Sequence, residues 1–170
     1  MSVTVLVGSA LVWSDEFNVN GAPDSSKWGY DLGAGGWGNN ESQYYTNRPE
    51  NIIVQDGLLK IKTLKESFSG SNYTSARILS KDKFSFKYGR VEIKAKLALG
   101  AGTWSALWML GSNISTTAWP ACGEVDIMEH VGNSQNRVHG SLHSPGRSGN
   151  TPDTSTVMVP NASTELHVYS

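Results

Sequence analysis

The chain has 170 residues, which is enough for one domain with a sizeable hydrophobic core. Its 14 Lys and Arg residues nearly balance 15 Asp and Glu residues, so the charge gives no sign of binding to nucleic acid or to an anionic membrane. Eighteen glycines and six tryptophans, with few helix-forming runs, favour short strands joined by turns. A single cysteine, Cys122, excludes an internal disulfide.

Short strands are predicted in the first half of the chain, at 11–13, 52–54, 58–64, 77–80 and 83–86. The strands at 52–54 and 58–64 flank Asp56-Gly57, a strong signal for a hairpin turn. A passage rich in Gly and Asn, from 31 to 40, carries Trp37 between two glycines. Glycine this dense allows tight turns and a close approach of the backbone to a ligand.

The second half shows clearer alternation, with strands predicted at 90–97, 104–110, 124–129, 138–143 and 165–170. The segment from 144 to 156 is predicted to be a loop rich in Ser, Gly and Pro. The pattern is typical of an antiparallel β-sandwich. Because the last strand stops without a closing turn, we expect the chain to be truncated at its C-terminus.

The strand around 124–129 contains three of the fifteen acids, Glu124, Asp126 and Glu129. Alternation puts Glu124 and Asp126 on one face, and one extra residue, a β-bulge placed at Met128, brings Glu129 to the same face. The two glutamates are then about 13 Å apart at Cα, and their carboxyl groups meet at about 5 Å. That separation suits a retaining glycosidase, which needs roughly 5–5.5 Å. Because the ionisation of three neighbouring acids is electrostatically unfavourable, we expect one of them to hold a proton near neutral pH.

Together with Trp104, Trp108 and Trp119, the sequence Glu-Val-Asp-Ile-Met-Glu at 124–129 resembles glycoside hydrolase family 16, and most of all its bacterial laminarinases. Weaker matches follow in the order of that family, at 11–17, 36–41, 88–92, 103–110, 119–130 and 139–143. The resemblance implies an all-β fold, a jelly-roll β-sandwich of two antiparallel sheets. It implies one partial catalytic domain over 1–170, without the C-terminal strands of the family.

The resemblance also assigns roles to individual residues. Glu124 is similar in position to the nucleophile of the family, Glu129 to its acid/base, and Asp126 to the residue that steadies the nucleophile. The side chains that resemble substrate-binding residues, or lie where they would line the site, are Trp37, Asn40, Glu41, Arg77, Trp104, Trp108, Trp119 and His143. A purely structural role remains an alternative for several of them, since tryptophans often belong to a core and an arginine at a strand edge often forms an ordinary ion pair.

Catalysis in this family needs no cofactor, but many members carry a structural calcium. Its ligands here would be the Glu16 carboxylate and the Gly57 carbonyl, whereas the third ligand, a C-terminal Asp, has no counterpart. Since missing strands leave unpaired edges, we expect a complementary chain or self-association to complete the sandwich. The resemblance further implies secretion, although no signal peptide is visible.

These observations predict an endo-acting, retaining hydrolase of β-1,3-glucan of the laminarin type. Two alternatives remain open. The first is a glucan-binding module that does not turn over because the chain is truncated. The second is the same chemistry on mixed-linkage β-glucan or on a galactan.

Overall fold

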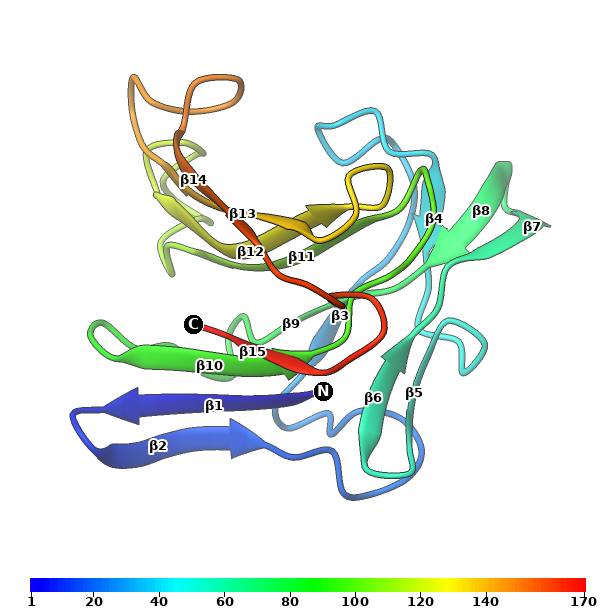
Figure 1. Cartoon of the computed structure of the whole chain (residues 1–170), viewed down its shortest axis with the longest axis horizontal. Coiled ribbons are helices and arrows are strands. Elements are labelled where there is room, and N and C mark those ends of the chain that lie inside the picture. Colours follow the sequence, from blue (N-terminus) through cyan, green and yellow to red (C-terminus); the bar gives the residue numbers. More distant parts are fainter. The chain divides into compact units, whose positions relative to one another are not determined.

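The computed structural model describes all 170 residues, and every element of regular structure in it is a β-strand. The chain divides into two compact units, Met1–Gly89 and Arg90–Ser170 (Figure 1). No helix is long and apolar enough to cross a membrane.

The first unit holds nine short strands. They are β1 (Ser2–Val7), β2 (Ala10–Asp15), β3 (Gly29–Asp31), β4 (Gln43–Tyr45), β5 (Ile52–Gln55), β6 (Leu58–Ile61), β7 (Leu64–Phe68), β8 (Ser71–Ser75) and β9 (Arg77–Leu79). The pairs β1–β2, β3–β9, β5–β6 and β7–β8 are antiparallel. Strand β4 departs from this pattern, because it pairs with β8 in parallel.

An aromatic cluster anchors the start of the first unit. The Trp13 ring stacks on Phe84 with centroids 5.3 Å apart and meets Trp28 edge-on at 5.4 Å. Buried Asp15 accepts hydrogen bonds from the Trp28 indole at 2.7 Å and from the Phe17 amide at 3.0 Å. Trp13 and Trp28 are therefore half-buried members of this aromatic cluster.

The predicted hairpin at Asp56-Gly57 is confirmed. Strands β5 and β6 pair from Ile52↔Ile61 to Gln55↔Leu58, and the two turn residues both have positive φ, 58° and 72°. Such a two-residue turn matches the twist of the strands that it joins. Gly57 adopts this conformation without the strain that a side chain would add.

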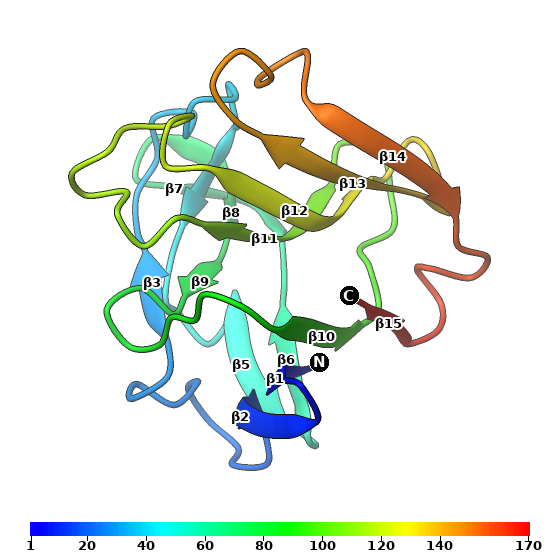
Figure 2. The same cartoon turned by 90° about the vertical axis from the view of Figure 1, so that its left-hand side faces the viewer.

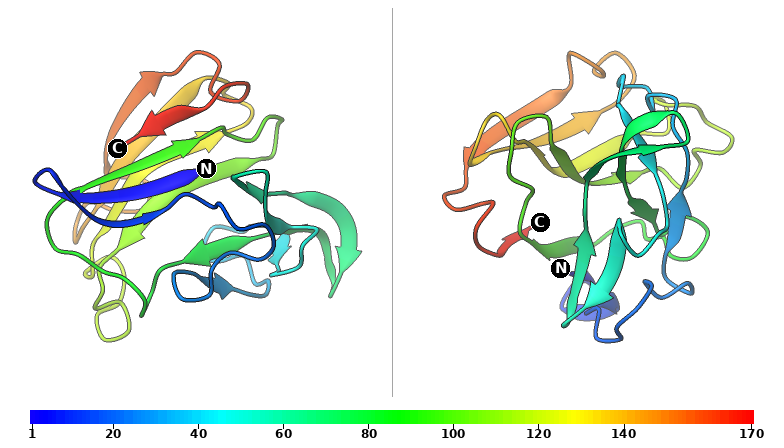
Figure 3. Two further views of the ribbon diagram at one scale, coloured as in Figure 1. Left: turned by 90° about the horizontal axis from the view of Figure 1, so that it is seen from below. Right: turned by 90° about the vertical axis from the view of Figure 1, so that its right-hand side faces the viewer.

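The second unit holds β10 (Arg90–Ala95), β11 (Trp104–Leu110), β12 (Glu124–Val131), β13 (Arg137–His143), β14 (Asp153–Met158) and β15 (His167–Tyr169). Strands β11 to β14 form a four-stranded antiparallel sheet in the order of the sequence (Figure 2). Strand β15 lies antiparallel to β10, with Ile93 opposite Tyr169 (Figure 3).

The alternation predicted for 90–97 is confirmed. Ile93, Ala95 and Leu97 are buried, while Arg90 and Lys94 are exposed. Tyr169, across from Ile93, is buried as well. Apolar side chains at every second position thus give the β10–β15 pair one buried face.

Several strands differ from the sequence-based prediction. The segment 83–86 is not a strand but a turn and irregular chain, because its aromatic residues join the Trp13 cluster instead of a sheet. The segment 144–156, predicted as a loop, contains the first part of β14. Strands β1, β3, β4, β7 and β8 were not predicted; β3 and β4 have three residues each, and β7 and β8 carry many polar residues.

Candidate active site

Strand β12 places its three carboxylates on one face by means of a bulge. Against β11, Glu124 lies opposite Leu110, Asp126 opposite Trp108 and Glu129 opposite Ala106. Residues 110, 108 and 106 alternate regularly, so their partners share a face. The register against β11 skips Ile127, and the register against β13 skips both Ile127 and Met128, so the bulge consists of these two residues and includes the predicted position at Met128. Met128 keeps a paired place opposite Leu107 because its side chain, 1% exposed, fills the core.

The spacing of the two glutamates follows from the same register. Their partners on β11, Leu110 and Ala106, are four residues apart, and so are their partners on β13, His143 and His139. Four strand residues span about 13 Å between Cα atoms. The five residue steps from Glu124 to Glu129 therefore span only four pleat steps.

Two tryptophans hold one carboxylate each. The Trp104 indole nitrogen donates to Oε1 of Glu129 at 3.1 Å, and the Trp119 indole nitrogen donates to Oε2 of Glu124. Both indoles are nearly half exposed, at 49% and 43%. Each indole thus donates to one oxygen of its carboxylate. The prediction that Trp104 and Trp119 belong to the site agrees with this geometry.

Asp126 is the most buried of the three acids, with 6% of its surface exposed. The pKa of Asp126 is raised to about 7, chiefly by burial and also by the negative charges of Glu124 and Glu129 and a hydrogen bond to Glu124. Asp126 therefore holds a proton near neutral pH. In that state its carboxyl group can donate a hydrogen bond to Glu124.

His143, on β13, approaches Asp126 rather than Glu129. Its Nε2 lies 3.1 Å from Oδ2 of Asp126, and its ring lies 5.8 Å from that of Trp119. The register explains the difference, since His143 is opposite Glu124 and one diagonal step from Asp126, at the other end of the acidic face from Glu129. Trp108, directly opposite Asp126, occupies the middle of the same face.

The loop that carries Trp119 is fixed to the end of β11. Gly111 donates from its amide to the Gly123 carbonyl at 3.2 Å. A Cβ at Gly111 would lie 2.1 Å from the Cys122 carbonyl oxygen, so a glycine is required there. This close approach brings the two ends of the loop together and sets Trp119 beside Glu124.

The predicted residues of the first unit form a cluster of their own. The Arg77 guanidinium lies 4.2 Å from the centre of the Trp37 ring and makes a 2.7 Å ion pair with Asp31 across the β3–β9 ladder. Trp37 in turn packs against Tyr45 with centroids 5.4 Å apart. Arg77 thus combines the ordinary ion pair with a stacked position on an aromatic ring.

Glu41 belongs to this cluster through its hydrogen bonds. It accepts from the Tyr45 hydroxyl at 2.8 Å and from the Gln43 amide at 2.5 Å. Burial, together with the hydrogen bond and the charge of Glu41, raises the pKa of Tyr45. Tyr45 and Gln43 were missed from the sequence, although Glu41, Gln43 and Tyr45 alternate as one strand face would. Asn40 lies beside this cluster in an exposed turn with φ of 55°.

The predicted calcium ligands do not make a site by themselves. Glu16 and Gly57 are both exposed. They supply two oxygen ligands, whereas Ca²⁺ takes six to eight. No group of three or more His, Cys, Asp or Glu side chains is placed to hold a metal ion. The residues of this chain therefore do not fit a complete calcium site, and the calcium stays a prediction.

Comparison with known proteins identifies the family of this chain. The model for glycosyl hydrolases family 16 matches residues 39–170, most of the chain. The chain belongs to this family. A beta-glucanase of Rhodothermus marinus is 47% identical over 165 residues, which cover 94% of this chain and 58% of the relative. The chain thus spans little more than half the length of that relative.

Solved structures of family members share the fold. The laminarinase of Rhodothermus marinus has a TM-score of 0.89 at 48% identity, over 93% of this chain and 65% of that one. A non-specific endo-beta-1,3(4)-glucanase of family 16, crystallised with a glucan oligosaccharide at its active site, has a TM-score of 0.91 at 40% identity, over 98% and 69%. The predicted all-β jelly-roll fold class and the resemblance to laminarinases are confirmed.

Proposed function

We propose that this chain carries the catalytic centre of a retaining endo-β-1,3-glucanase. The observation that supports this best is the face of β12, where Glu124 and Glu129 stand four pleat steps apart and each accepts a bond from its own indole. Two glutamates at about 13 Å between Cα atoms can bring their carboxyl groups to about 5 Å. A gap of that size favours direct attack by one carboxylate over attack by an intervening water.

In the first step, the Glu124 carboxylate attacks the anomeric carbon and forms a glycosyl ester. Glu129 gives its proton to the glycosidic oxygen, and that bond breaks. In the second step, the Glu129 carboxylate takes a proton from water, whose oxygen attacks the same carbon and releases Glu124. The configuration at the anomeric carbon is inverted twice and so retained.

Asp126 assists these two reaction steps by keeping Glu124 ionised and correctly oriented. Its raised pKa, about 7, allows it to donate a hydrogen bond to the nucleophile at neutral pH. His143, 3.1 Å from Asp126, holds the other side of that carboxyl group. Above the pKa of Asp126 a further negative charge appears beside Glu124, and we expect turnover to fall.

The names of the relatives support β-1,3-glucan as the substrate. A laminarinase and a non-specific endo-beta-1,3(4)-glucanase are among the matching structures, so linkage specificity varies among similar chains. Trp104, Trp108 and Trp119 would stack on sugar rings, because the C–H face of a pyranose packs well on an aromatic plane. The Trp37–Arg77 cluster would bind sugar hydroxyls in the same polymer.

The deciding experiment measures release of reducing sugar from laminarin by the 170-residue chain and by Glu124→Gln, purified identically. We expect activity in the first and none above background in the second. Equal rates would refute the assignment. Proton NMR of the first product should show the β-anomer before mutarotation, whereas an initial α-anomer would refute retention.

Binding without turnover is the second candidate, favoured by the 58% share of the Rhodothermus relative that this chain spans. It predicts that the chain sediments with insoluble β-1,3-glucan but releases no sugar. Parallel assays on mixed-linkage β-glucan and agarose would show whether the same centre prefers another polymer. We also propose that the protein works outside the cell, because such polymers are too large to enter it.

A further inference from the structure

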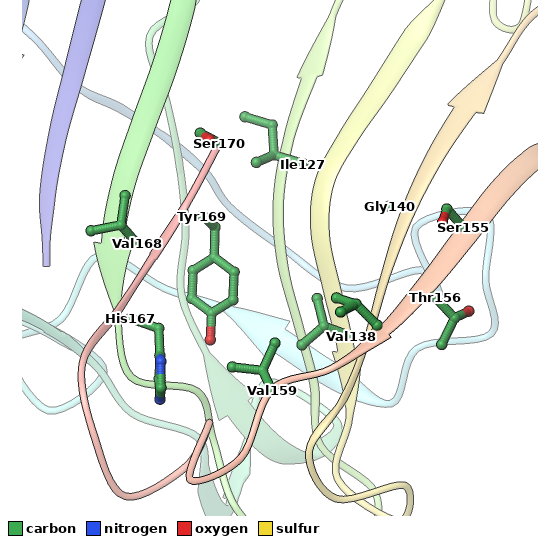
Figure 4. Close-up of a pocket in the computed structure, with 11 residues that line it drawn as sticks. Ile127, Val138, Gly140, Ser155, Thr156, Val159, His167, Val168, Tyr169 and Ser170 are labelled. Carbon is green, nitrogen blue, oxygen red and sulfur yellow. The ribbon is translucent and has the colours of Figure 1, made fainter.

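The interiors of the two units differ in kind. In the second unit, apolar side chains such as Val138 and Val159 line a cavity of about 420 Å³ beside β15 (Figure 4). In the first unit, buried polar side chains gather at the parallel pair of β4 and β8, and they belong to Thr46, Asn51, Thr74 and Ser75. Buried polar groups are stable when their hydrogen bonds are made, so the partners of these four show what they hold together.

Asn51 is the centre of this polar group. Its side chain is fully buried, and its amide uses every hydrogen-bonding position that it has. Nδ2 donates to Oγ1 of Thr74 at 2.9 Å and to the Lys62 carbonyl at 3.1 Å. Oδ1 accepts from Oγ1 of Thr46 at 2.5 Å and from the Arg48 guanidinium at 3.0 Å. These four bonds allow the amide only one orientation.

Through these bonds Asn51 joins the end of β4 to β8. Thr46 directly follows Tyr45, the last residue of β4, and Thr74 belongs to β8. The ladder between the two strands is parallel and has only three residue pairs, so it is weak by itself. The Thr46 amide adds one bond, to the Ser75 carbonyl at 2.9 Å. The Asn51 side chain therefore fixes the position of β4 along β8.

These two strands also position the Trp37–Arg77 cluster, whose members are Trp37, Glu41, Tyr45 and Arg77. Tyr45 contacts this cluster while its neighbour Thr46 contacts Asn51, because adjacent side chains point to opposite faces of a strand. Arg77 begins β9, two residues after the end of β8, and its guanidinium lies 5.5 Å from the centre of the Tyr45 ring. A shift of β4 along β8 would therefore move Tyr45 and Glu41 relative to Arg77.

We propose that Asn51 is a positioning residue for the Trp37–Arg77 cluster. It clamps β4 to β8 and so sets the place of Glu41 and Tyr45 relative to Arg77. Being fully buried, it does not touch a ligand itself. The inference rests on the proposed function in one respect, namely that the Trp37–Arg77 cluster binds sugar hydroxyls.

The test removes one partner of Asn51, because Asn51→Ala would leave several buried groups unpaired and is prone to unfold the chain. Thr46→Val deletes the hydroxyl that donates to Asn51 and keeps a similar shape. Thr46→Ser keeps the hydroxyl and should restore the parent behaviour. Thr63→Val is the matched control, since it deletes a hydroxyl that lies 3.1 Å from Oγ of Ser75 on β8 and is not bonded to Asn51.

The first readout is a proton–nitrogen NMR spectrum of the chain without ligand. The Trp37 ring and the Arg77 guanidinium lie 5.4 Å and 5.5 Å from the centre of the Tyr45 ring, whose ring current shifts their N–H signals. We expect both signals to move in Thr46→Val and to keep their positions in Thr46→Ser and Thr63→Val. A purely structural role would lower the melting temperature of Thr46→Val without moving them. Unmoved signals in folded Thr46→Val would overturn the proposal.

The second readout is the affinity for a laminarin oligosaccharide, measured by tryptophan fluorescence, which needs no turnover. We expect Thr46→Val to weaken binding about three- to ten-fold, and Thr46→Ser and Thr63→Val to bind as the parent chain does. Binding that Arg77→Lys weakens but Thr46→Val does not would overturn the positioning role. If the two NMR signals move while neither Arg77→Lys nor Thr46→Val weakens binding, Asn51 positions the cluster as proposed, and the sugar-binding role of the cluster is refuted instead.

Discussion

Replacing Asp126 by Asn tests the electrostatics of the acidic face through protein stability. The folded-state pKa of Asp126, about 7, lies above its ordinary value of 3.8, chiefly because the carboxyl group is buried. A carboxyl group with a raised pKa stabilises the fold fully below pH 3.8, and this contribution is lost as the pH rises through 7. Asn keeps the shape and has no proton to lose. The variant should therefore gain stability over the parent as the pH rises.

The size of this gain follows from the two pKa values. Their difference, from 3.8 to about 7, corresponds to about 4 kcal/mol between the fully protonated and the fully ionised states. Between about pH 5 and pH 8, the linkage relation assigns about 3 kcal/mol of it to the change in stability. Since Asp126 is only 6% exposed, solvent screening reduces this little. For a chain of this length, 3 kcal/mol shifts the melting temperature by about 6–12 °C.

The assay is urea unfolding of both proteins at pH 5, 6, 7 and 8, followed by tryptophan fluorescence. Asp153→Asn, which removes an exposed carboxylate from β14, controls for the loss of one acid anywhere in the second unit. The stability difference between Asp126→Asn and the parent should widen steadily over this range. A difference that stays constant within about 0.5 kcal/mol would show that Asp126 does not hold the raised pKa.

Three further outcomes are expected. Trp119→Phe removes the indole donor to Glu124 and should lower kcat/KM on laminarin about 10- to 100-fold; an unchanged value would mean that the bond has no role in turnover. Arg77→Lys removes the planar group stacked on Trp37 and should raise KM about 5- to 30-fold without changing kcat. A decrease in kcat with an unchanged KM would contradict this expectation. Burial lowers the pKa of His130, which has no hydrogen-bond partner, so stability should decline as the pH falls below 6.5. His130→Leu should decline less, and parallel melting curves from pH 7.5 to 5 would argue against this cause.

The acidic face could be predicted from sequence because it depends on short-range regularities. Alternation places Glu124 and Asp126 together, and chemistry requires Glu129 to join them, so the bulge could be inferred. Its full extent could not, because the inclusion of Ile127 beside Met128 depends on the pairing with both neighbouring strands. The Met128 side chain, 1% exposed, fills the core, which is a result of tertiary packing.

Pairings between distant segments could not be predicted from the sequence either, because they also depend on tertiary packing. Strands β4 and β8 lie in parallel although 25 residues separate Tyr45 from Ser71, and no local pattern encodes that register. His143 was assigned to the site from alternation, but its partner, Asp126, depends on the register of β12 against β13. Proton placement on Asp126 likewise depends on burial, which only the assembled sheet determines.

The bulge at Ile127 and Met128 has a consequence for how paired glutamates of this kind should be sought in other sequences. On each neighbouring strand the partners of Glu124 and Glu129 lie four positions apart, whereas the two glutamates lie five positions apart on β12 itself. A sequence with one residue fewer at this point would place its two glutamates at the same distance by plain alternation. Two sequence patterns of different length can therefore encode the same arrangement of the two glutamates. A search that requires a fixed residue spacing would miss proteins in which the two glutamates have the same positions in the sheet.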